Sequence, residues 1–577
     1  MKKKLLPALI VTGLIILVVI IMGITALINK YTPTKKTEDL KEYFNISSDD
    51  EAALIVDNEL SDYKAKIIDK KIYVDYKFVH DSLNSRFYWD ANENVLLYTT
   101  ASDIISAAAD SNSYSVTKQT NDFGYPIVKA TSDSALIALD YVKQYSNITF
   151  KSYDDPARIV ITSKWDEIDS ATVSKSTQVR VKGGIKSPIL KEVKKDDKIT
   201  ILDSGDKWDK VATEDGVIGY IKSKALSESK KNKLTNPDYE EETFTHIKKD
   251  KDICLAWNQV TSQSANSKVP QVISSTKGIN VMSPTWFYLN DNNGNLADIA
   301  SKDYVSYCHS QGIEVWGLFS NFENTDVDAA YVLTHTSTRT TLINQIMSAA
   351  FNYELDGVNI DFENITEAAY GDSYIEFIRE LAIKCHNNGI SLSVDVTVPA
   401  SFNKFFNRSD MANFADYIVI MGYDEHYKGS DAGSVSSIPW VTEGVESTLK
   451  EVPADQIILG MPFYTRIWEL TPKEDDDAVT DTEDQSKYTV ASQVYSMDAA
   501  AAQLATNNAT AALDEESGQN YAEWSVSNKL YKVWLEDSTS LEKRLKLVDD
   551  NKLAGAAFWK LGFENSSVWD TVIKYLD

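Results

Sequence analysis

Apolar runs of strand length recur along the C-terminal half of the chain, and amphipathic helical patterns separate most of them. One such helix is expected at Tyr374–Asn387, with Gly389 just beyond its end, as is common at helix C-termini. Eight runs are expected to be strands: Ile253–Val260, Gly278–Phe287, Ile313–Phe319, Leu355–Phe362, Ile390–Val398, Asp416–Gly422, Gln456–Tyr464 and Leu553–Trp559. Strands and helices that alternate in this order predict a closed barrel of eight parallel strands within residues 246–577.

The interval between the last two predicted strands is too long for a single helical crossover. We therefore expect residues 466–528 to form an insertion that carries short strands of its own. Such an insertion would wall one side of a cleft at the mouth of the barrel.

The fourth predicted strand ends in polar side chains at every second position. Successive side chains of a strand point to opposite faces, so Asn359, Asp361 and Glu363 share one face, while the residues between them are apolar and would pack against helices. Two carboxylates one pleat apart resist ionising together, so one of them tends to keep its proton near neutral pH. Glu363 is outermost and best placed to donate a proton to a glycosidic oxygen. The simpler alternative is a solvated strand end with ordinary carboxylates.

The string Asp356-Gly-x-Asn359-x-Asp361-x-Glu363 resembles the Asp-Gly-x-Asp-x-Asp-x-Glu signature of family 18 glycoside hydrolases. The resemblance extends from about Lys251 to the C-terminus. The segment from Met421 to Asp424 is similar to the family's Met-x-Tyr-Asp segment, and Trp559 is similar to the tryptophan that closes its sugar subsite. The resemblance implies a (β/α)8 TIM barrel with glycosidase activity.

The resemblance also implies a catalytic role for each matching residue. In this family the nucleophile is the N-acetyl oxygen of the substrate, which forms an oxazolinium ion. Glu363 would be the general acid and later the base, and Asp361 would orient the acetamido group. Tyr423 and Asp424 would hold that group from the opposite side. Trp559 would form an apolar floor under the sugar ring.

Asn359 departs from the family pattern, because typical members have an aspartate there that shares a proton with the middle carboxylate. Asparagine can form hydrogen bonds but cannot titrate. We therefore expect the active site to be tuned differently and not to lose its activity. Together with Ser283–Phe287 and Gly555–Gly562, the asparagine resembles the bacterial cell-wall branch of the family, which includes spore-cortex N-acetylglucosaminidases.

Further residues at the strand ends are candidates for substrate contact, and each could instead pack the barrel. Besides Trp559, the candidate substrate-binding residues are Met421, Tyr464, Trp286 and Arg466, and Trp257 is a further candidate.

The N-terminus predicts a membrane anchor. Residues 1–4 carry three lysines, and residues 5–28 are apolar and uncharged over a length that can span a bilayer. A signal peptide has a shorter apolar core and a small-residue cleavage site, and no convincing site follows here. We expect a single-pass protein in the cell membrane, with residues 1–4 cytoplasmic, a linker at residues 29–45 and the C-terminal domains extracellular.

Residues 46–166 contain two units with a strand–helix–strand–strand order. The first runs from Lys71 to Tyr98, and the second, with a helix expected at Ala135–Tyr145, runs from Tyr125 to Ile161. This small α+β repeat resembles the stalk module named after the N-terminal domain of copper amine oxidases, and nothing in it implies copper.

Residues 171–228 contain short strands between turn signals and resemble a small all-β bacterial SH3-like domain, with Trp208 and Tyr220 as core or groove aromatics. Such a module would bind the cell wall or act as a passive spacer. A linker at residues 229–245, with a hinge rich in lysine and serine, is expected before the barrel.

Composition narrows the possible partners. A formal net charge of −27 disfavours nucleic acid as a partner. Three cysteines are too few for a disulfide framework, and we expect Cys254, Cys308 and Cys385 to be buried core residues. The six histidines show no zinc spacing, and phosphate-binding glycine loops are absent, so neither a metal nor a cofactor is implied.

The sequence thus predicts a multidomain, membrane-anchored, extracellular retaining glycosidase that cleaves β-1,4 bonds of an N-acetylglucosamine-containing glycan, with peptidoglycan as the expected polymer. The alternatives within the same class are a chitinase and an endo-β-N-acetylglucosaminidase. An alternative of another class is a non-catalytic protein that binds cell-wall glycan.

Overall fold

The computed structural model describes residues 5–363, 365, 370–473 and 484–576 of the 577-residue chain. The chain forms two compact units, which are described separately. Unit 1 comprises Met1–Trp89, Ala107–Tyr114 and Asn121–Glu241, and unit 2 comprises Asp90–Ser106, Ser115–Thr120 and Glu242–Asp577.

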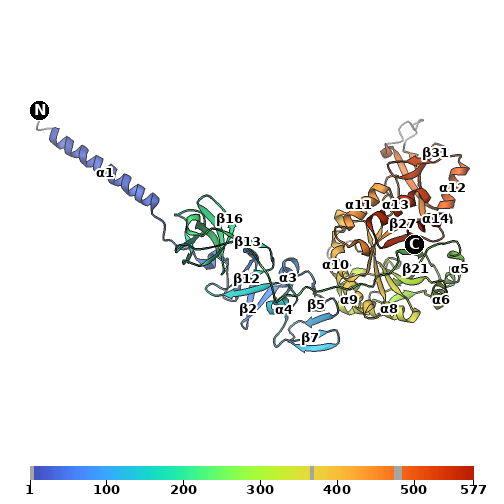
Figure 1. The fold of residues 1–577 in the computed structure, drawn as a ribbon, viewed down its shortest axis with the longest axis horizontal. Helices are drawn as coiled ribbons and strands as arrows, with labels where there is room; N and C mark the ends of the chain where they lie inside the picture. The colour runs from blue at the N-terminus through green and yellow to red at the C-terminus, as the bar shows by residue number, and fades with distance from the viewer. Residues whose placement is uncertain (1–4, 364, 366–369, 474–483, 577) are drawn as a thin grey trace. The chain divides into compact units, whose positions relative to one another are not determined.

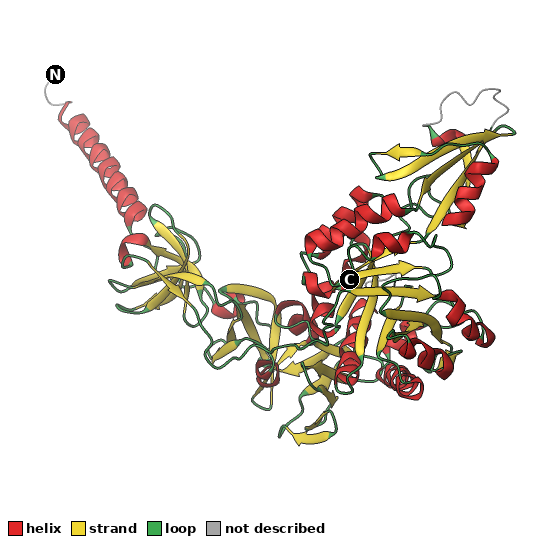
Figure 2. Ribbon diagram, turned by 45° about the vertical axis from the view of Figure 1, so that its right-hand side comes forward, coloured by secondary structure: helices red, strands yellow, loops and turns green. Residues whose placement is uncertain are grey.

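The core of unit 2 is a closed barrel of eight parallel strands, which confirms the predicted barrel (Figures 1 and 2). The strands are β20 (Ile253–Asn258), β21 (Val281–Leu289), β23 (Glu314–Ser320), β24 (Gly357–Asp361), β25 (Ser391–Thr397), β26 (Tyr417–Met421), β27 (Ile457–Pro462) and β33 (Gly555–Trp559). The barrel closes because β20 pairs in parallel with both β21 and β33.

Helices cover the outside of the barrel (Figure 2). The longer ones are α6 (Lys302–Ser310), α8 (Thr336–Tyr353), α9 (Gly371–His386), α11 (Ile438–Thr448) and α13 (Ser538–Asn551), and the shorter ones are α5 (Val269–Val272), α7 (Ala329–Thr334), α10 (Arg408–Phe414) and α14 (Val568–Val572). Strand alternation divides the core into two clusters. Leu255 and Trp257 pack inside the barrel, whereas Cys254 and Ala256 face the helices.

The three cysteines are buried and free, as predicted for core residues. Burial raises the pKa of the Cys254 and Cys308 thiols to about 12, so neither thiol is activated as a nucleophile.

The insertion between β27 and β33 is a five-stranded antiparallel sheet with the order β29-β28-β32-β31-β30. Its elements are β28 (Tyr464–Pro472), β29 (Tyr488–Ser496), α12 (Met497–Thr506), β30 (Ala512–Asp514), β31 (Gln519–Val526) and β32 (Lys529–Leu535). The inserted sheet is longer than the predicted range of residues 466–528. Ser527 and Asn528 both have positive φ angles and form the turn between β31 and β32, so Asn528 marks a hairpin and not the end of the insertion.

Unit 1 contains a seven-stranded sheet with the order β11-β12-β1-β2-β3-β10-β9. Its elements are β1 (Glu51–Val56), β2 (Glu59–Ile68), β3 (Lys71–Asp75), α3 (Tyr76–Ser82), β9 (Val128–Ala130), β10 (Ala135–Ala138), α4 (Leu139–Gln144), β11 (Thr149–Tyr153) and β12 (Arg158–Thr162). The helix predicted at Ala135–Tyr145 is wrong over its first four residues, because β10 pairs there with both β3 and β9. Residues 87–122, which are divided between the two units, contain a smaller sheet of β4 (Phe87–Asp90), β5 (Val95–Thr99), β6 (Ile104–Ala108), β7 (Ser113–Val116) and β8 (Gln119–Asp122).

A second seven-stranded sheet of unit 1 has the order β15-β14-β18-β17-β16-β13-β19. Its strands are β13 (Glu167–Thr172), β14 (Thr177–Arg180), β15 (Ile189–Val193), β16 (Lys198–Asp203), β17 (Trp208–Thr213), β18 (Ile218–Lys222) and β19 (Lys230–Lys233). The similarity of this part to SH3-like domains, and of the preceding part to an amine-oxidase stalk, remains a prediction.

Both predicted linkers contain ordered structure. In the range 229–245, β19 pairs antiparallel with β13 and extends the sheet. In the range 29–45, the backbone of Glu38 donates to Ile189 of β15, and Phe44 is fully buried with residues of both sheets. The linker assignments missed these segments because their partners lie far away in the sequence.

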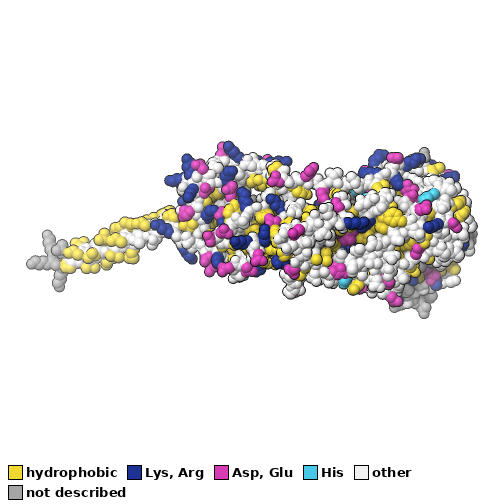
Figure 3. Space-filling model, turned by 90° about the horizontal axis from the view of Figure 1, so that it is seen from below, with side chains coloured by type: hydrophobic (Ala, Val, Ile, Leu, Met, Phe, Trp, Pro, Cys, Tyr) yellow, Lys and Arg dark blue, Asp and Glu magenta, His cyan; other side chains and the backbone are white. Residues whose placement is uncertain are grey.

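The chain begins with α1 (Leu5–Tyr31), whose side chains form a hydrophobic rod on the face seen in Figure 3. Within the described part of the chain, its Leu9–Tyr31 segment is the one helical stretch apolar and long enough to cross a membrane, and none of it is buried in the protein. By length and composition, this helix fits a signal anchor and also fits a signal sequence.

A buried ion pair fixes the return of the chain from the inserted sheet to the barrel. Glu536 follows β32 directly, and Arg544 on α13 forms an ion pair with its carboxylate and also donates to the carbonyl of Ser436. Both side chains are almost completely buried. Burial raises the pKa of Glu536 to about 7 even though Arg544 opposes this shift.

We expect Arg544→Met to lower the free energy of unfolding by about 3–5 kcal/mol, because it leaves the Glu536 carboxyl buried without its cation. Lys546→Met on the same helix removes only an exposed pair with Asp550 and should change it by less than about 1 kcal/mol. Urea denaturation that reports on unit 2 measures both. Equal effects of the two changes would contradict a structural role for the buried pair.

Candidate active site

A cavity of about 440 Å³ lies at the carboxyl ends of the barrel strands. The acidic residues that line it are Glu323, Asp361, Glu363, Asp395 and Asp424, and the aromatic residues are Trp257, Tyr288, Phe322, Tyr423 and Trp559. The carboxyl ends of parallel strands all meet at one face of a barrel, which brings together residues more than three hundred positions apart in the sequence, such as Trp257 and Trp559.

Asp361 and Glu363 stand at the end of β24 with different surroundings. Asp361 is buried, and its Oδ1 atom has no hydrogen-bond partner among the described residues. Glu363 is exposed in the wall of the cavity, and its backbone N–H donates to Asn321 Oδ1 at 3.1 Å.

Both carboxyl groups hold their protons more tightly than ordinary side chains. Burial raises the pKa of Asp361 well above its usual value, and the charges of Asp395, Glu363 and Glu323 add to that effect. The pKa of Glu363 is also raised, chiefly because the cavity wall shields part of its carboxyl group from water and further by the charges of Asp424 and Glu323. A pair of this kind can supply a proton near neutral pH.

Asn359 lies beneath the two carboxyl groups, and its amide uses all of its hydrogen-bonding capacity. Its Oδ1 accepts from Trp257 Nε1 and from Ser283 Oγ, both at 2.9 Å. Its Nδ2 donates to Ser393 Oγ at 3.1 Å and to Asp395 Oδ1 at 2.7 Å. The orientation of the amide is therefore fixed, and an aspartate could not make both donations.

On the opposite side of the cavity, two residues of the inserted sheet hold Asp424. Tyr464 Oη donates to Asp424 Oδ1 at 2.5 Å, and Arg466 Nη2 lies 3.7 Å from the same oxygen. Asp424 itself has a φ of +61°, a left-handed conformation that is uncommon outside glycine and accompanies many functional sites. Both holding residues lie at the start of β28, directly after the last barrel residues of β27.

Aromatic rings form the floor of the cavity. The ring of Trp257 meets that of Trp559 edge to face at 6.0 Å and that of Tyr423 at 6.4 Å. Rings in this arrangement offer an apolar surface on which the C–H face of a sugar can pack while its hydroxyls turn to polar partners.

Of the predicted substrate-binding residues, Trp559 lines the cavity, whereas Met421, Tyr464, Trp286 and Arg466 do not. Tyr464 and Arg466 contact Asp424 instead. Trp286 is fully buried, donates from Nε1 to Asn266 Oδ1 at 2.8 Å and packs edge to face on Tyr304 of α6. Strand alternation turns this side chain outward toward the helices, so the structure corrects this prediction. Met421 is also buried and is not part of the cavity wall.

Asp395 and Glu323 are site residues that the sequence reasoning missed. Ser393 and Asp395 are polar residues at alternate positions of β25, which is the same signal that singled out Asn359 and Asp361 on β24. Glu323 lies three residues after the end of β23, where Ser320 Oγ is 2.6 Å from each of its carboxylate oxygens. No periodic signal marks a residue in such a loop.

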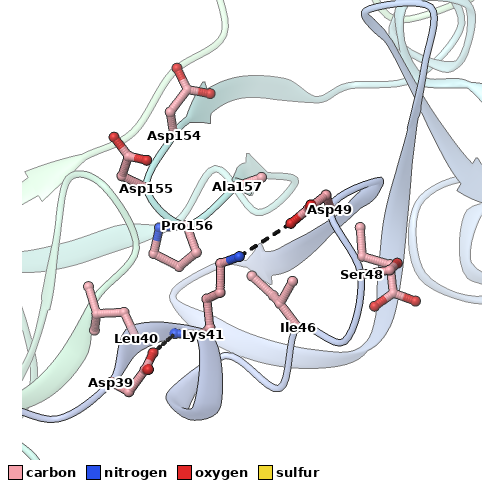
Figure 4. Close-up of a pocket in the computed structure, with 11 residues that line it drawn as sticks. Asp39, Leu40, Lys41, Ile46, Ser48, Asp49, Asp154, Asp155, Pro156 and Ala157 are labelled. Atoms are coloured by element: carbon pink, nitrogen blue, oxygen red, sulfur yellow. Dashed lines mark hydrogen bonds and ion pairs between the residues drawn. The ribbon is translucent and has the colours of Figure 1, made fainter.

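A second cavity, of about 550 Å³, lies in unit 1 and is also acidic (Figure 4). Lys41 reaches from its wall to Asp49, and Asp39 accepts from the Lys41 backbone. Hydrogen bonds from Ser47 lower the pKa of Glu51 in this wall to about 2, so Glu51 cannot serve as a proton donor. Over the described parts of the chain, no group of three or more His, Cys, Asp or Glu side chains is arranged to hold a metal ion.

In comparisons with known proteins, residues 323–564 match the family model described as Glycosyl hydrolases family 18. The chain is 24% identical over 302 residues to an uncharacterized glycosylase, YvbX, of Bacillus subtilis, an alignment that covers 49% of this chain and 81% of the relative. It is 24% identical over 287 residues to the cortical fragment-lytic enzyme of the same organism, which covers 48% of this chain and 63% of that relative. This second match thus leaves more than a third of the relative uncovered.

Among solved structures, the C-terminal domain of a predicted chitinase from Desulfitobacterium hafniense superimposes with a TM-score of 0.50 at 19% identity. The superposition covers 57% of this chain and 100% of the other and supports the barrel fold. Fold, acidic cavity and family match together define a glycoside hydrolase. The family match covers residues 323–564, which include the barrel strands from β24 to β33.

We expect Asp424→Asn to change the dependence of kcat/KM on pH. The fall in kcat/KM on the basic side, which is the basic limb of the profile, should begin at a lower pH. The Asp424 charge raises the pKa of Glu363, so its removal lets Glu363 lose its proton earlier as the pH rises. Hydrolysis of a soluble glycoside across pH measures the limb, and Asp431→Asn, an exposed change in the same loop, is the matched control. A basic limb that stays in place would contradict the coupling.

Proposed function

We propose that this protein is a membrane-anchored, extracellular retaining glycosidase that cleaves β-1,4 bonds of an N-acetylglucosamine-containing glycan, with peptidoglycan as its substrate. The observation that carries the proposal is the pair Asp361 and Glu363, both with raised pKa values, facing Tyr423 and Asp424 across an aromatic floor. This arrangement suits a reaction in which the protein supplies one proton and positions an acetamido group.

In the first step, the protonated Glu363 gives its proton to the glycosidic oxygen as the bond to the anomeric carbon breaks. The acetamido oxygen of the substrate attacks that carbon and forms an oxazolinium ion, so no protein atom is bonded to the sugar. In the second step, Glu363 accepts a proton from water, which opens the oxazolinium ring from the face that the leaving group occupied. Two inversions at one carbon give overall retention.

The other residues of the cavity orient the substrate. Asp361 lies beside Glu363, where it can bind the acetamido N–H, and Tyr423 can donate to the acetamido oxygen from the opposite side. Tyr464 and Arg466 fix Asp424, which removes the need to order this carboxylate during the reaction. Trp559 provides the surface for the sugar ring in the cleft.

The choice of peptidoglycan is supported by the relatives and by the N-terminal helix. One relative is named a cortical fragment-lytic enzyme. An apolar helix with lysines before it would hold the barrel outside the membrane, where the wall lies. The second sheet of unit 1, with its similarity to SH3-like domains, would contact the wall.

We expect Glu363→Gln to lower kcat on purified peptidoglycan by roughly 10²–10⁴-fold, because the amide cannot donate a proton to the leaving oxygen. Mass spectrometry of new reducing ends measures cleavage, and Glu443→Gln on the exposed face of α11 is the control. N-acetylglucosamine ends from peptidoglycan support the proposal. Release from chitin oligosaccharides alone would make the protein a chitinase, whereas binding without release would make it a glycan-binding protein.

We also expect the protein to remain in the membrane fraction with the residues of α1 still attached, because an anchor keeps the segment that a signal peptidase would remove. Membrane fractionation followed by N-terminal sequencing tests this, and a protein that starts at residue 31 provides the soluble control. A mature N-terminus downstream of α1 would show that the helix is a cleaved signal.

A further inference from the structure

The polar network under the active site contains an acid that the family signature does not predict. Asp395 lies on β25, the strand that pairs in parallel with β24, and is 3% exposed. The ladder between the two strands pairs Asn359 with Ser393 and Ile360 with Val394. Asp361 and Asp395 each follow the last of these pairs, so they are neighbours across strands that lie about 4.8 Å apart.

The hydrogen bonds distinguish these two neighbouring carboxyl groups. Asn359 Nδ2 donates to Asp395 Oδ1 at 2.7 Å, and such a bond favours the ionised form of a carboxyl. Asp361 Oδ1 has no partner within the described residues, and a buried carboxylate without partners is far more costly than the neutral acid. Two adjacent carboxyls that cannot both ionise will therefore carry the proton on Asp361.

We infer that Asp395 is the acidic partner of Asp361, and that it keeps this side chain protonated in the free enzyme. The acid that the resemblance assigns to position 359 is thus replaced by one on the neighbouring strand, and Asn359 orients it. Asp395 is a positioning residue that acts through Asp361, and this inference rests on the proposed acetamido-assisted reaction.

A protonated Asp361 does two things during the reaction. Its O–H can donate to the Glu363 carboxylate that forms once the proton has passed to the leaving oxygen, and its carbonyl oxygen can accept from the acetamido N–H. No proton leaves Asp361, so the protons of the first step remain balanced. The negative charge on Asp395 also favours the positive charge that develops on the oxazolinium ring.

Other groups around the pair affect this distribution of charge. The charges of Glu363 and Glu323 raise the pKa of Asp361 further, and the charges of Asp361 and Asp395 add to the effect of burial in raising the pKa values of the Tyr374 and Tyr423 phenols. Burial raises the pKa of Asp395 as well, and only the Asn359 bond opposes this rise. The cluster therefore retains protons to higher pH than separate carboxyls would.

Moving the acid from position 395 to position 359 tests the inference. We expect Asp395→Asn to reduce kcat by roughly 10–10²-fold and to move the basic limb of the pH profile to lower pH, because the coupled pair of Asp361 and Glu363 then loses its first proton more easily. The double change Asn359→Asp with Asp395→Asn returns an acid to the cluster and should recover most of kcat and the original limb. Asp303→Asn on α6, an exposed carboxyl, is the matched control.

A pH profile of Asp395→Asn that matches the wild type would falsify the inference, as would a double variant no better than the single one. Failure of the wild type to cleave any N-acetylglucosamine glycan would count against the proposed function instead.

A second readout needs no substrate. Asp361 and Asp395 both have raised pKa values in the folded protein. Above pH about 4, the folded state therefore binds more protons than the unfolded chain. The free energy of unfolding then falls as the pH rises through the raised pKa values. Each Asp→Asn change should raise the Tm of unit 2 at neutral pH in the full-length protein. Asp361→Asn combined with Asp395→Asn should raise the Tm by less than the sum of the two single shifts, because either change alone relieves the repulsion between the two carboxyl groups. Additive shifts would overturn the coupling.

Discussion

Burying several carboxyl groups at the mouth of a closed barrel is the constraint on which the site depends. Each buried charge costs several kcal/mol unless hydrogen bonds or protons compensate it. The protein meets this requirement with an amide: Asn359 binds an indole, two hydroxyls and one carboxyl, and so satisfies four groups at once. The cost of burying charge that these hydrogen bonds do not offset appears in the raised pKa values of Asp361 and Glu363. Raised pKa values are the property that acid catalysis needs.

The barrel makes this concentration of acids possible. Its alternating strands place apolar side chains both inside and outside, so rigidity is provided by two separate clusters of packed residues. The acidic residues that line the cavity lie at the carboxyl ends of the strands and in the loops that follow them. A cavity with an indole floor and acidic walls lowers the effective dielectric around the reacting groups and strengthens each electrostatic contact.

The sequence allowed all eight barrel strands to be located, because apolar runs and alternation are local signals. It also identified Asp361, Glu363, Tyr423, Asp424 and Trp559, which all line the cavity. Asp395 could have been found by the same alternation, but its importance depends on strand register, which places it beside Asp361 and which no local pattern encodes. Trp286 was misassigned because an aromatic residue near a strand end can face either way.

Unit 1 shows the same limit in another form. Phe44 and the lysine-rich strand β19 lie in segments whose composition is typical of linkers, yet one is buried and the other is paired. Burial of a single aromatic side chain against residues more than a hundred positions away outweighs local composition. Contacts between distant segments, and not propensities, determine where these modules begin and end.

The inserted sheet has a role that its position in the chain conceals. Its first strand carries Tyr464 and Arg466, and these side chains hold the carboxylate of Asp424 in place. A change to these first residues of β28 would also release Asp424, so the inserted sheet acts on the cleft through two side chains that do not line it.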